Sequence, residues 1–483
     1  MSKRKGQLTT IEAIQQALVS SISDLDSSAS TLWVGFSAGV DSTVLLHALA
    51  LASAAGKTDI DIKAIHVHHG LSLNADAWSQ QAQVLCAELS ARYQLNIECI
   101  IERVQLDNCG GLEQAARQAR YQVFEKLCQK GDVLFQGHHL DDQVETFFMR
   151  AIRGSGLTGL TGIPKQRNLS RSNNCQIVRP LLGFEKNQIL EYAHAYQLHW
   201  VEDESNQDPT IDRNWWRTQL LPQIWQRYPD QKHALIRTLD TISHEHHLLQ
   251  QLLNQKLASY KATNNAEDTF HSALKKLPYF DLQLIQGLDS AVALSYVRAW
   301  LSQYVDVLPS AMQMKSIYVD MIQAREDAEP NFKWADSVLY RYRDLIFLVT
   351  ADPLITGLED GKTLPWQGAV FSCPAGELIC EQLNRAQKAS ATGLKPGSYA
   401  LRLWQSGDVA KPFNRSTRKM KKWWQDYKVP SWARPHWPLI IDTDTGQIAA
   451  VPGLFICHNY IAHEAEIPWL CHWQFNSELT SPK

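Results

Sequence analysis

The chain has 483 residues, of which 45% are hydrophobic and 20% charged, with 47 Lys and Arg against 50 Asp and Glu. These proportions are those of a folded globular protein, so they exclude wholesale disorder and a fibrous repeat. A net charge of −3 argues against a protein that coats nucleic acid nonspecifically, but it allows a local basic face. The length predicts two to four domains, since one domain takes roughly 100–200 residues.

The nine cysteines are scattered, and no two have the C-x-x-C spacing of zinc ribbons, ferredoxins or thioredoxins. An odd, scattered set is typical of reduced thiols, so we expect a cytoplasmic protein. No apolar stretch follows the basic residues 1–5, and we therefore expect no signal peptide. The chain contains no run of 18 apolar residues, so we predict no membrane-spanning helix.

The first third of the chain alternates strand-like and helix-like segments. This alternation predicts βαβ units and a parallel sheet, whose ligands bind at the carboxyl ends of the strands. The expected strands are 32–36, 62–67, 97–104 and 132–136, and the expected helices are 40–54, 76–93, 112–129 and 142–152.

The rest of the chain changes in character. Residues 231–323 have a mostly helical pattern, and 334–340 is expected to pair with 342–349 as a hairpin. Residues 352–368 contain prolines and several glycines, which predicts a linker. We therefore expect three domains, at 1–225, 226–355 and 356–483.

A candidate phosphate loop directly follows the first expected strand and opens the first expected helix. Small residues there leave backbone N–H groups free to meet an anion, and the helix dipole adds partial positive charge. Asp41 beside a phosphate indicates an intervening Mg²⁺. The loop lacks the lysine of a Walker A motif, and an ordinary βα turn is the plainer alternative. Its residues are Ser37, Ala38, Gly39, Val40, Asp41 and Ser42.

A second candidate motif follows the fourth expected strand. Asp142 and Glu145 are three residues apart and share one helix face. Like charges so placed are costly unless they hold a metal or face a cationic substrate. His138, just before the helix, is an acid, base or ligand candidate. The alternative is a helix start with a favourable acidic first turn.

Three histidines, His66, His68 and His69, close the second expected strand. They suit zinc by type, but no second ligand cluster lies nearby in sequence, so a polar loop near a nucleotide is favoured.

Arginines form a further pattern. Arg117 and Arg120 share a helical stripe with Glu113, which is either a ligand surface or an exposed, salt-bridged face. Arg213 and Arg217, near the end of the first expected domain, suit the phosphates of a ligand or of RNA.

Residues 411–428 contain seven basic residues against a single acid, Asp426, with aromatic residues between them. Basic side chains bind phosphates and aromatic rings stack on bases, so the segment predicts an RNA-docking surface. The alternative is a solvated helix face whose aromatic residues belong to the core. The candidate RNA contacts are Arg415, Arg418, Lys419, Lys421, Lys422 and Trp423.

Taken together, these motifs resemble a known family. Residues 37–42 resemble the PP-loop of N-type ATP pyrophosphatases, usually S-G-G-x-D-S. The chain as a whole resembles bacterial tRNA(Ile)-lysidine synthetases, and 419–439 is similar to their C-terminal domain. The resemblance implies an α/β N-terminal PP-loop domain with a parallel sheet (adenine nucleotide alpha hydrolase-like), a mainly helical substrate-binding domain and a small α+β tRNA-binding domain. The other segments that carry it are 66–70, 113–121, 138–146, 153–156, 179–182 and 213–217.

The resemblance also implies an activity. It is the ATP-dependent ligation of free L-lysine to C2 of the wobble cytidine of tRNA(Ile) with a CAU anticodon, through an adenylated cytidine. The product, lysidine, changes the tRNA from methionine to isoleucine identity and from AUG to AUA decoding. The implied cofactors are ATP and Mg²⁺, the partners are this tRNA and lysine, and no membrane is involved. The oligomeric state is left open, a homodimer included.

The site residues follow from the same resemblance. ATP is expected at 37–42, and Mg²⁺ at Asp41, with Asp142 and Glu145 as further candidates. Ala38 replaces the first glycine of the usual loop, and we expect this position to need a small side chain rather than a positive φ. The expected catalytic residues are Asp41, His138, Asp142, Glu145, Arg117 and Arg213.

Three rival interpretations remain at this point. A tRNA-thiolating PP-loop enzyme commonly uses a cysteine pair, which this chain lacks at C-x-x-C spacing. A ligase that amidates a small molecule leaves the basic aromatic segment unexplained. A non-catalytic RNA-binding protein is supported only by Ala38.

Overall fold

The computed structural model divides the chain into two compact units, residues 1–249 (unit 1) and 250–483 (unit 2). Helix α10, Lys232–Thr263, crosses this boundary. No helix in the described part of the chain is long and apolar enough to cross a membrane. The structure describes residues 9–25, 29–72, 74–106, 112–170, 173, 175–229, 231–264, 266–325, 328–350, 363–368, 370–373, 375–382, 393–463 and 466–475.

Unit 1 is built on a sheet with the strand order β3-β2-β1-β4-β6-β5. Every neighbouring pair is parallel except β5 with β6, so the predicted parallel sheet is confirmed. The sequence analysis did not foresee β5 and β6. The strands are β1 Thr31–Gly35, β2 Asp61–His68, β3 Glu98–Arg103, β4 Val133–Phe135, β5 Gln166–Asn168 and β6 Gln176–Val178.

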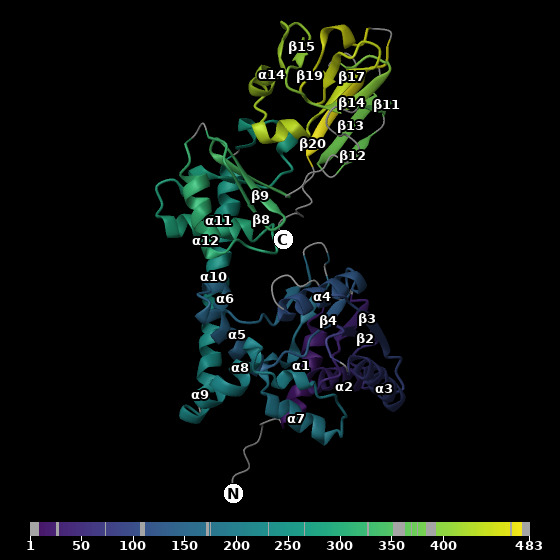
Figure 1. Ribbon diagram of the computed structural model, residues 1–483, viewed down its shortest axis with the longest axis vertical. Helices are drawn as coiled ribbons and strands as arrows, with labels where there is room; N and C mark the ends of the chain where they lie inside the picture. Colours follow the sequence, from purple (N-terminus) through teal and green to yellow (C-terminus); the bar gives the residue numbers. More distant parts are fainter. Residues whose placement is uncertain are drawn as a thin grey trace. The chain divides into compact units, whose positions relative to one another are not determined.

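Helices cover both faces of this sheet. Leu32 and Val34 of β1 pack with α1, α2, α3 and α7, whereas Trp33, which points the other way, packs with α4. Figure 1 shows α4 on the opposite side of the strands from α2 and α3. The helices are α1 Thr10–Ser23, α2 Val40–Ala54, α3 Ala75–Tyr93, α4 Leu112–Leu127, α5 Leu140–Ile152, α6 Leu157–Leu160, α7 Lys186–Ala195, α8 Asp212–Trp215 and α9 Leu221–Arg227.

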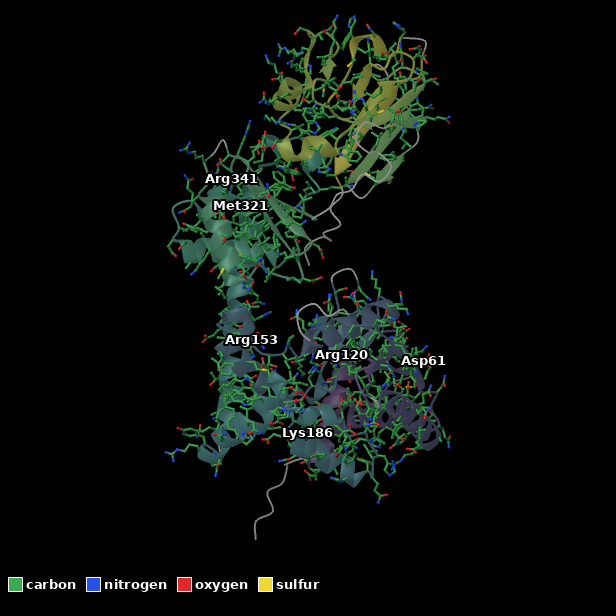
Figure 2. The ribbon with its side chains drawn as sticks, viewed as in Figure 1. Asp61, Arg120, Arg153, Lys186, Met321 and Arg341 are labelled. Atoms are coloured by element: carbon green, nitrogen blue, oxygen red, sulfur yellow. The ribbon has the colours of Figure 1, made fainter. Side chains whose placement is uncertain are left out.

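The first part of unit 2 combines helices with an antiparallel sheet of order β7-β10-β9-β8. The predicted hairpin forms between β9 and β10, but its turn is at Arg343 and Asp344 rather than at Arg341. Arg341 stays in the strand because its buried guanidinium donates to the carbonyl of Met321 at 2.7 Å (Figure 2). The elements are β7 Tyr279–Asp281, α11 Ser290–Leu301, α12 Ala311–Ser316, β8 Asn331–Trp334, β9 Ser337–Tyr342 and β10 Leu345–Thr350.

The last part of unit 2 is mainly antiparallel sheet, arranged as β11-β14-β17-β18-β19, β12-β13-β20 and β15-β16. Residues 352–362 of the predicted linker lie outside the described residues. The linker prediction is wrong for Leu364–Trp366, which forms β11 because Trp366 is buried in the core. The elements are β11, β12 Phe371–Cys373, β13 Gly376–Gln382, β14 Tyr399–Leu403, β15 Val409–Ala410, β16 Arg418–Lys419, α14 Met420–Asp426, β17 Pro438–Asp442, β18 Ile448–Val451, β19 Phe455–Ile456 and β20 Trp469–Phe475.

Tryptophan dominates the core of this last part, where Trp424, Trp437 and Trp473 are almost completely buried. The described cysteines are all free thiols, and Cys109 lies outside the described residues. The fold class expected from the sequence is confirmed, with the addition of the sheet formed by β7 to β10. The division at 225 and 355 stays a prediction.

Candidate active site

The loop between β1 and α2 has the geometry of an anion site. Gly39 is the N-cap of α2, and having no side chain it leaves the first turn of the helix uncapped. The hydroxyl oxygens of Ser37 and Ser42 lie 3.2 Å apart at this helix end, and the Ser42 hydroxyl donates to the Gly39 carbonyl. Amides, hydroxyls and the helix dipole therefore converge where a phosphate can bind.

Ala38 has a φ of 62°, so the expectation that this position needs only a small side chain is wrong. The residue is fully buried, and its carbonyl accepts hydrogen bonds from the Val201 amide at 2.9 Å and from the Thr43 hydroxyl at 3.3 Å. These bonds hold the loop in the left-handed region, where an alanine costs about 1–2 kcal/mol.

Gly137 brings the two predicted motifs into contact. A Cβ placed on Gly137 would lie 3.1 Å from the carbonyl carbon and oxygen of Asp41 and 3.2 Å from the Ser42 amide nitrogen. A Cβ at these distances would push the segment after β4 and the first turn of α2 apart by a few tenths of an ångström, so glycine permits their close approach. The phosphate loop and the His138–Glu145 motif thus form one site.

Asp41 is paired with Lys186, the first residue of α7. The Lys186 ammonium donates to both Asp41 carboxylate oxygens, at 2.7 and 2.8 Å, and the Lys186 amide donates to Asp141. Lys186, labelled in Figure 2, was not predicted as a site residue. No local pattern links it to the loop, because 145 residues separate it from Asp41.

The pKa values of the two neighbouring histidines are shifted in opposite directions. Burial lowers the pKa of His139, but the carboxylates of Asp141, Asp142 and Asp41 outweigh burial and raise it. Burial lowers the pKa of His138 to about 3. The Nε of Arg179 donates to the Nδ1 of His138 at 3.2 Å, so the neutral His138 ring carries its proton on Nε2.

Asp142 and Glu145 are held by two arginines. Arg213 donates to both carboxylates at 2.7 Å, and Arg217 donates to Glu145 at 2.6 and 3.0 Å. Burial raises the pKa of Asp142, but the charges of His139 and Arg213 outweigh it and lower the pKa. The structure therefore brings the predicted Asp142, Glu145 and Arg213 together and adds Arg217.

Asp41 suits Mg²⁺ better than Asp142 and Glu145 do. All three carboxylates accept from cationic side chains, but those of Asp142 and Glu145 are also buried, which makes both a poor fit for a metal. Asp41 fits, since its carboxylate is partly exposed beside the loop hydroxyls, and Mg²⁺ often binds through one or two carboxylates, water and phosphates. Among the described residues, no group of three or more His, Cys, Asp and Glu side chains is placed to hold a metal ion.

Three other positions considered in the sequence have contacts of their own. Arg117, on α4, lies over the ring of Tyr121, with 5.1 Å between its guanidinium carbon and the ring centroid. His66 pairs with the Phe36 carbonyl at 3.0 Å, and His68 with Asp76 at 3.2 Å. His66 thus braces the start of the phosphate loop.

In the basic segment of unit 2, the cationic side chains are exposed to solvent and the tryptophans are buried. Lys421 and Lys422 on α14 are exposed, whereas Trp423 and Trp424 are buried. The Trp423 indole donates to the Ala410 carbonyl at 3.1 Å, so its ring belongs to the core. This departs from its predicted place on an RNA-binding surface.

The parallel sheet and the phosphate loop define an ATP-using enzyme of the PP-loop class. Family models agree with this assignment and extend it along the chain. Residues 9–224 match a model described as a PP-loop domain, 280–347 match the TilS substrate binding domain, and 400–473 match the TilS substrate C-terminal domain.

Curated relatives identify the family. The tRNA(Ile)-lysidine synthase of Photobacterium profundum is 33% identical, and the match covers 91% of this chain and 95% of that protein. The enzyme of the same name from Vibrio atlanticus is 35% identical with the same coverage. The chain belongs to the tRNA(Ile)-lysidine synthase family and is an ATP-dependent ligase that modifies tRNA.

Two solved structures are also similar in part. The "U34-tRNA thiolase NcsA from Methanococcus maripaludis" aligns with a TM-score of 0.39 and 16% identity over 49% of this chain and 80% of that one. A "TILS C-terminal domain" aligns with a TM-score of 0.20 and 23% identity over 24% of this chain and all of that one.

Proposed function

We propose that the protein joins free L-lysine to C2 of the wobble cytidine in tRNA(Ile) with a CAU anticodon. In the first step, O2 of the cytidine attacks the α-phosphate of ATP and pyrophosphate leaves. In the second step, the lysine amine attacks C2 and AMP leaves. The observation that carries this proposal is the match to relatives named for this product over nine-tenths of the chain.

The phosphate loop is suited to the first step. Its helix N-terminus and the hydroxyls of Ser37 and Ser42 would hold the pyrophosphate as a leaving group without a P-loop lysine. When bound, Mg²⁺ would neutralise phosphate charge, and Asp41 is the residue that would hold it.

The buried ion cluster is suited to the second step. Lysine must be neutral to attack, so a proton has to leave its ammonium group. Asp142 and Glu145 are the proposed acceptors. The Nδ1 of His138 is already engaged by Arg179, which leaves Nε2–H as a donor to the cytidine or to a phosphate oxygen. Arg213 and Arg217, oriented by these carboxylates, would stabilise negative charge in the transition state.

Exposed cations of unit 2 are the proposed contacts for the tRNA backbone. Phosphate contacts position a nucleic acid without reading its sequence. These cations are Arg415, Arg418, Lys419, Lys421 and Lys422.

The test is a direct assay for the product. Purified protein is mixed with unmodified tRNA(Ile) bearing CAU, ATP, Mg²⁺ and isotopically labelled lysine, and the digested RNA is analysed by mass spectrometry. We expect a lysine adduct on one cytidine that requires ATP and is absent from methionine tRNA. ATP turnover without an adduct would contradict lysine as the acceptor.

A further inference from the structure

A group of arginines surrounds Tyr121 in unit 1, beside the site described above. The guanidinium carbons of Arg117 on α4 and Arg167 on β5 each lie 5.1 Å from the centroid of the Tyr121 ring. Arg179 follows β6 directly and is 1% exposed. Arg120, labelled in Figure 2, is the neighbour of Tyr121 in the chain.

Neutral partners hold these arginines. Arg179 donates to the Pro164 carbonyl and to the Gln136 side-chain oxygen, both at 2.8 Å, and to the neutral His138. Arg167 donates to the carbonyls of Asn168 and Leu169. These bonds satisfy N–H groups and fix their directions, but they cancel no charge.

The group therefore carries excess positive charge, which the carboxylate of Glu113 near Arg120 offsets only in part. In the described part of the chain, Arg117, Arg120, Arg167 and Arg179 form no ion pair with a carboxylate. The buried Nε of Arg120 has no hydrogen-bond partner among the described residues. Burying an unpaired charge is costly, so the arrangement is completed when an anion binds.

We propose that Arg117, Arg120, Arg167 and Arg179 bind a backbone phosphate of the RNA substrate, at a site separate from the ATP phosphates. This assignment rests on the proposed function. Guanidinium groups suit it because they bind phosphate oxygens in pairs. Exposure to solvent decreases across the group, from the exposed Arg117 to the buried Arg179. A phosphate on a large molecule can therefore reach the group from its exposed side.

The sheet order separates this anion site from the ATP site. ATP binds at the end of β1, whereas Arg179 follows β6, and β4 lies between the two strands. At about 4.8 Å per strand, the two strands are roughly 10 Å apart. His138, at the end of β4, lies between the sites. A cytidine base near His138 would therefore face ATP on one side and carry its phosphate to the arginines on the other.

The test compares RNA binding with ATP binding. Arg117→Gln and Arg167→Gln change the more accessible members, and Arg227→Gln is the matched control, an exposed arginine over the ring of Tyr228. We expect the first two to weaken binding of the CAU-bearing tRNA about tenfold and to reduce its salt slope by about 0.7 for each lost phosphate contact. Binding of ATP should not change, and the control should behave as wild type.

Each other outcome contradicts the assignment in a different way. Weakened ATP binding with normal tRNA binding would show that these arginines bind ATP rather than the RNA. Normal tRNA binding with an unchanged salt slope would leave the proposed function standing and remove the phosphate site. Absence of tRNA binding by the wild-type protein would overturn both.

A second measurement needs no variant and so does not depend on its folding. The wild-type protein is treated with an arginine-specific dicarbonyl reagent, and the modified positions are mapped by mass spectrometry. We expect tRNA, but not ATP, to protect Arg117 and Arg167 from modification. Equal modification with and without tRNA would overturn the assignment.

Discussion

The Lys186 ammonium donates hydrogen bonds to both carboxylate oxygens of Asp41, at 2.7 and 2.8 Å, and so links the start of α7 to the first turn of α2. The residue best suited to hold Mg²⁺ is thus already paired with a cation. A metal that binds Asp41 has to compete with Lys186 for the same oxygens.

We predict that Lys186→Met lowers the Mg²⁺ concentration needed for half-maximal ATP binding. The pair is partly exposed, so its strength is about 1 kcal/mol or less, which corresponds to a shift of roughly two- to fivefold. The measurement is a Mg²⁺ titration at fixed ATP. Lys57→Met, at an exposed position, should show no shift, and an increased Mg²⁺ requirement in Lys186→Met would contradict the competition.

We predict that Ala38→Gly leaves the free energy of unfolding within about 1 kcal/mol of wild type. Relief of the positive φ gains about 1–2 kcal/mol. Loss of a buried methyl group costs about 0.8 kcal/mol and the added chain freedom about 0.5–1 kcal/mol. Ala50→Gly, buried inside α2, should lose about 2 kcal/mol, since no strain is relieved there. Urea denaturation measures both, and equal losses would show that Ala38 is unstrained.

We predict that the pKa of His138 lies well below the ordinary histidine value and that the pKa of His139 lies above it. NMR of labelled histidines checks this, with assignments from His138→Gln and His139→Gln. The raised pKa of His139 contributes stability that is present below the unfolded value near 6.5 and is lost as pH rises through the folded value. The lowered pKa of His138, about 3, contributes stability that is present above 6.5 and is lost as pH falls towards 3. Titration of both rings near 6.5 would refute the opposite pKa shifts of His138 and His139.

We predict that Glu145→Ala destabilises unit 1 by about 3 kcal/mol, because it removes one of the two carboxylates that Arg213 and Arg217 share and leaves them with Asp142. Glu145→Gln keeps the shape and should lose less. Lysine transfer should fall in both variants if Glu145 accepts the proton. Normal turnover in Glu145→Gln would exclude that role.

We predict that changing Lys421 and Lys422 together to Ala weakens tRNA binding evenly across tRNA sequences. If each contacts one phosphate, the slope of log K against log salt should fall by about 1.5. Lys315→Ala, at another exposed position of unit 2, is the control. An unchanged slope would show that these two lysines do not contact the tRNA backbone.

The sequence predicted the parts of the site that depend on local order. The phosphate loop follows a strand and opens a helix, and Asp142 and Glu145 share a helix face, so spacing alone revealed them. Lys186 and Arg217 were not predictable as partners of these carboxylates, because they reach them across 145 and 72 residues. Strand β5 is polar and β6 has only two apolar residues, so neither shows the apolar run that marked the equally short β4. The burial of Trp423 was also invisible, since a basic aromatic stretch looks alike with its rings inside or outside.

The missing side chain of Gly137 has a consequence for how this enzyme can change. The backbone just after β4 lies against the first turn of α2, and a Cβ at 137 would push the two motifs apart by a few tenths of an ångström. A variant with a side chain at 137 would keep every reacting group but hold the groups of the two motifs farther apart. We therefore expect it to bind ATP and to bind tRNA, but to modify the tRNA slowly.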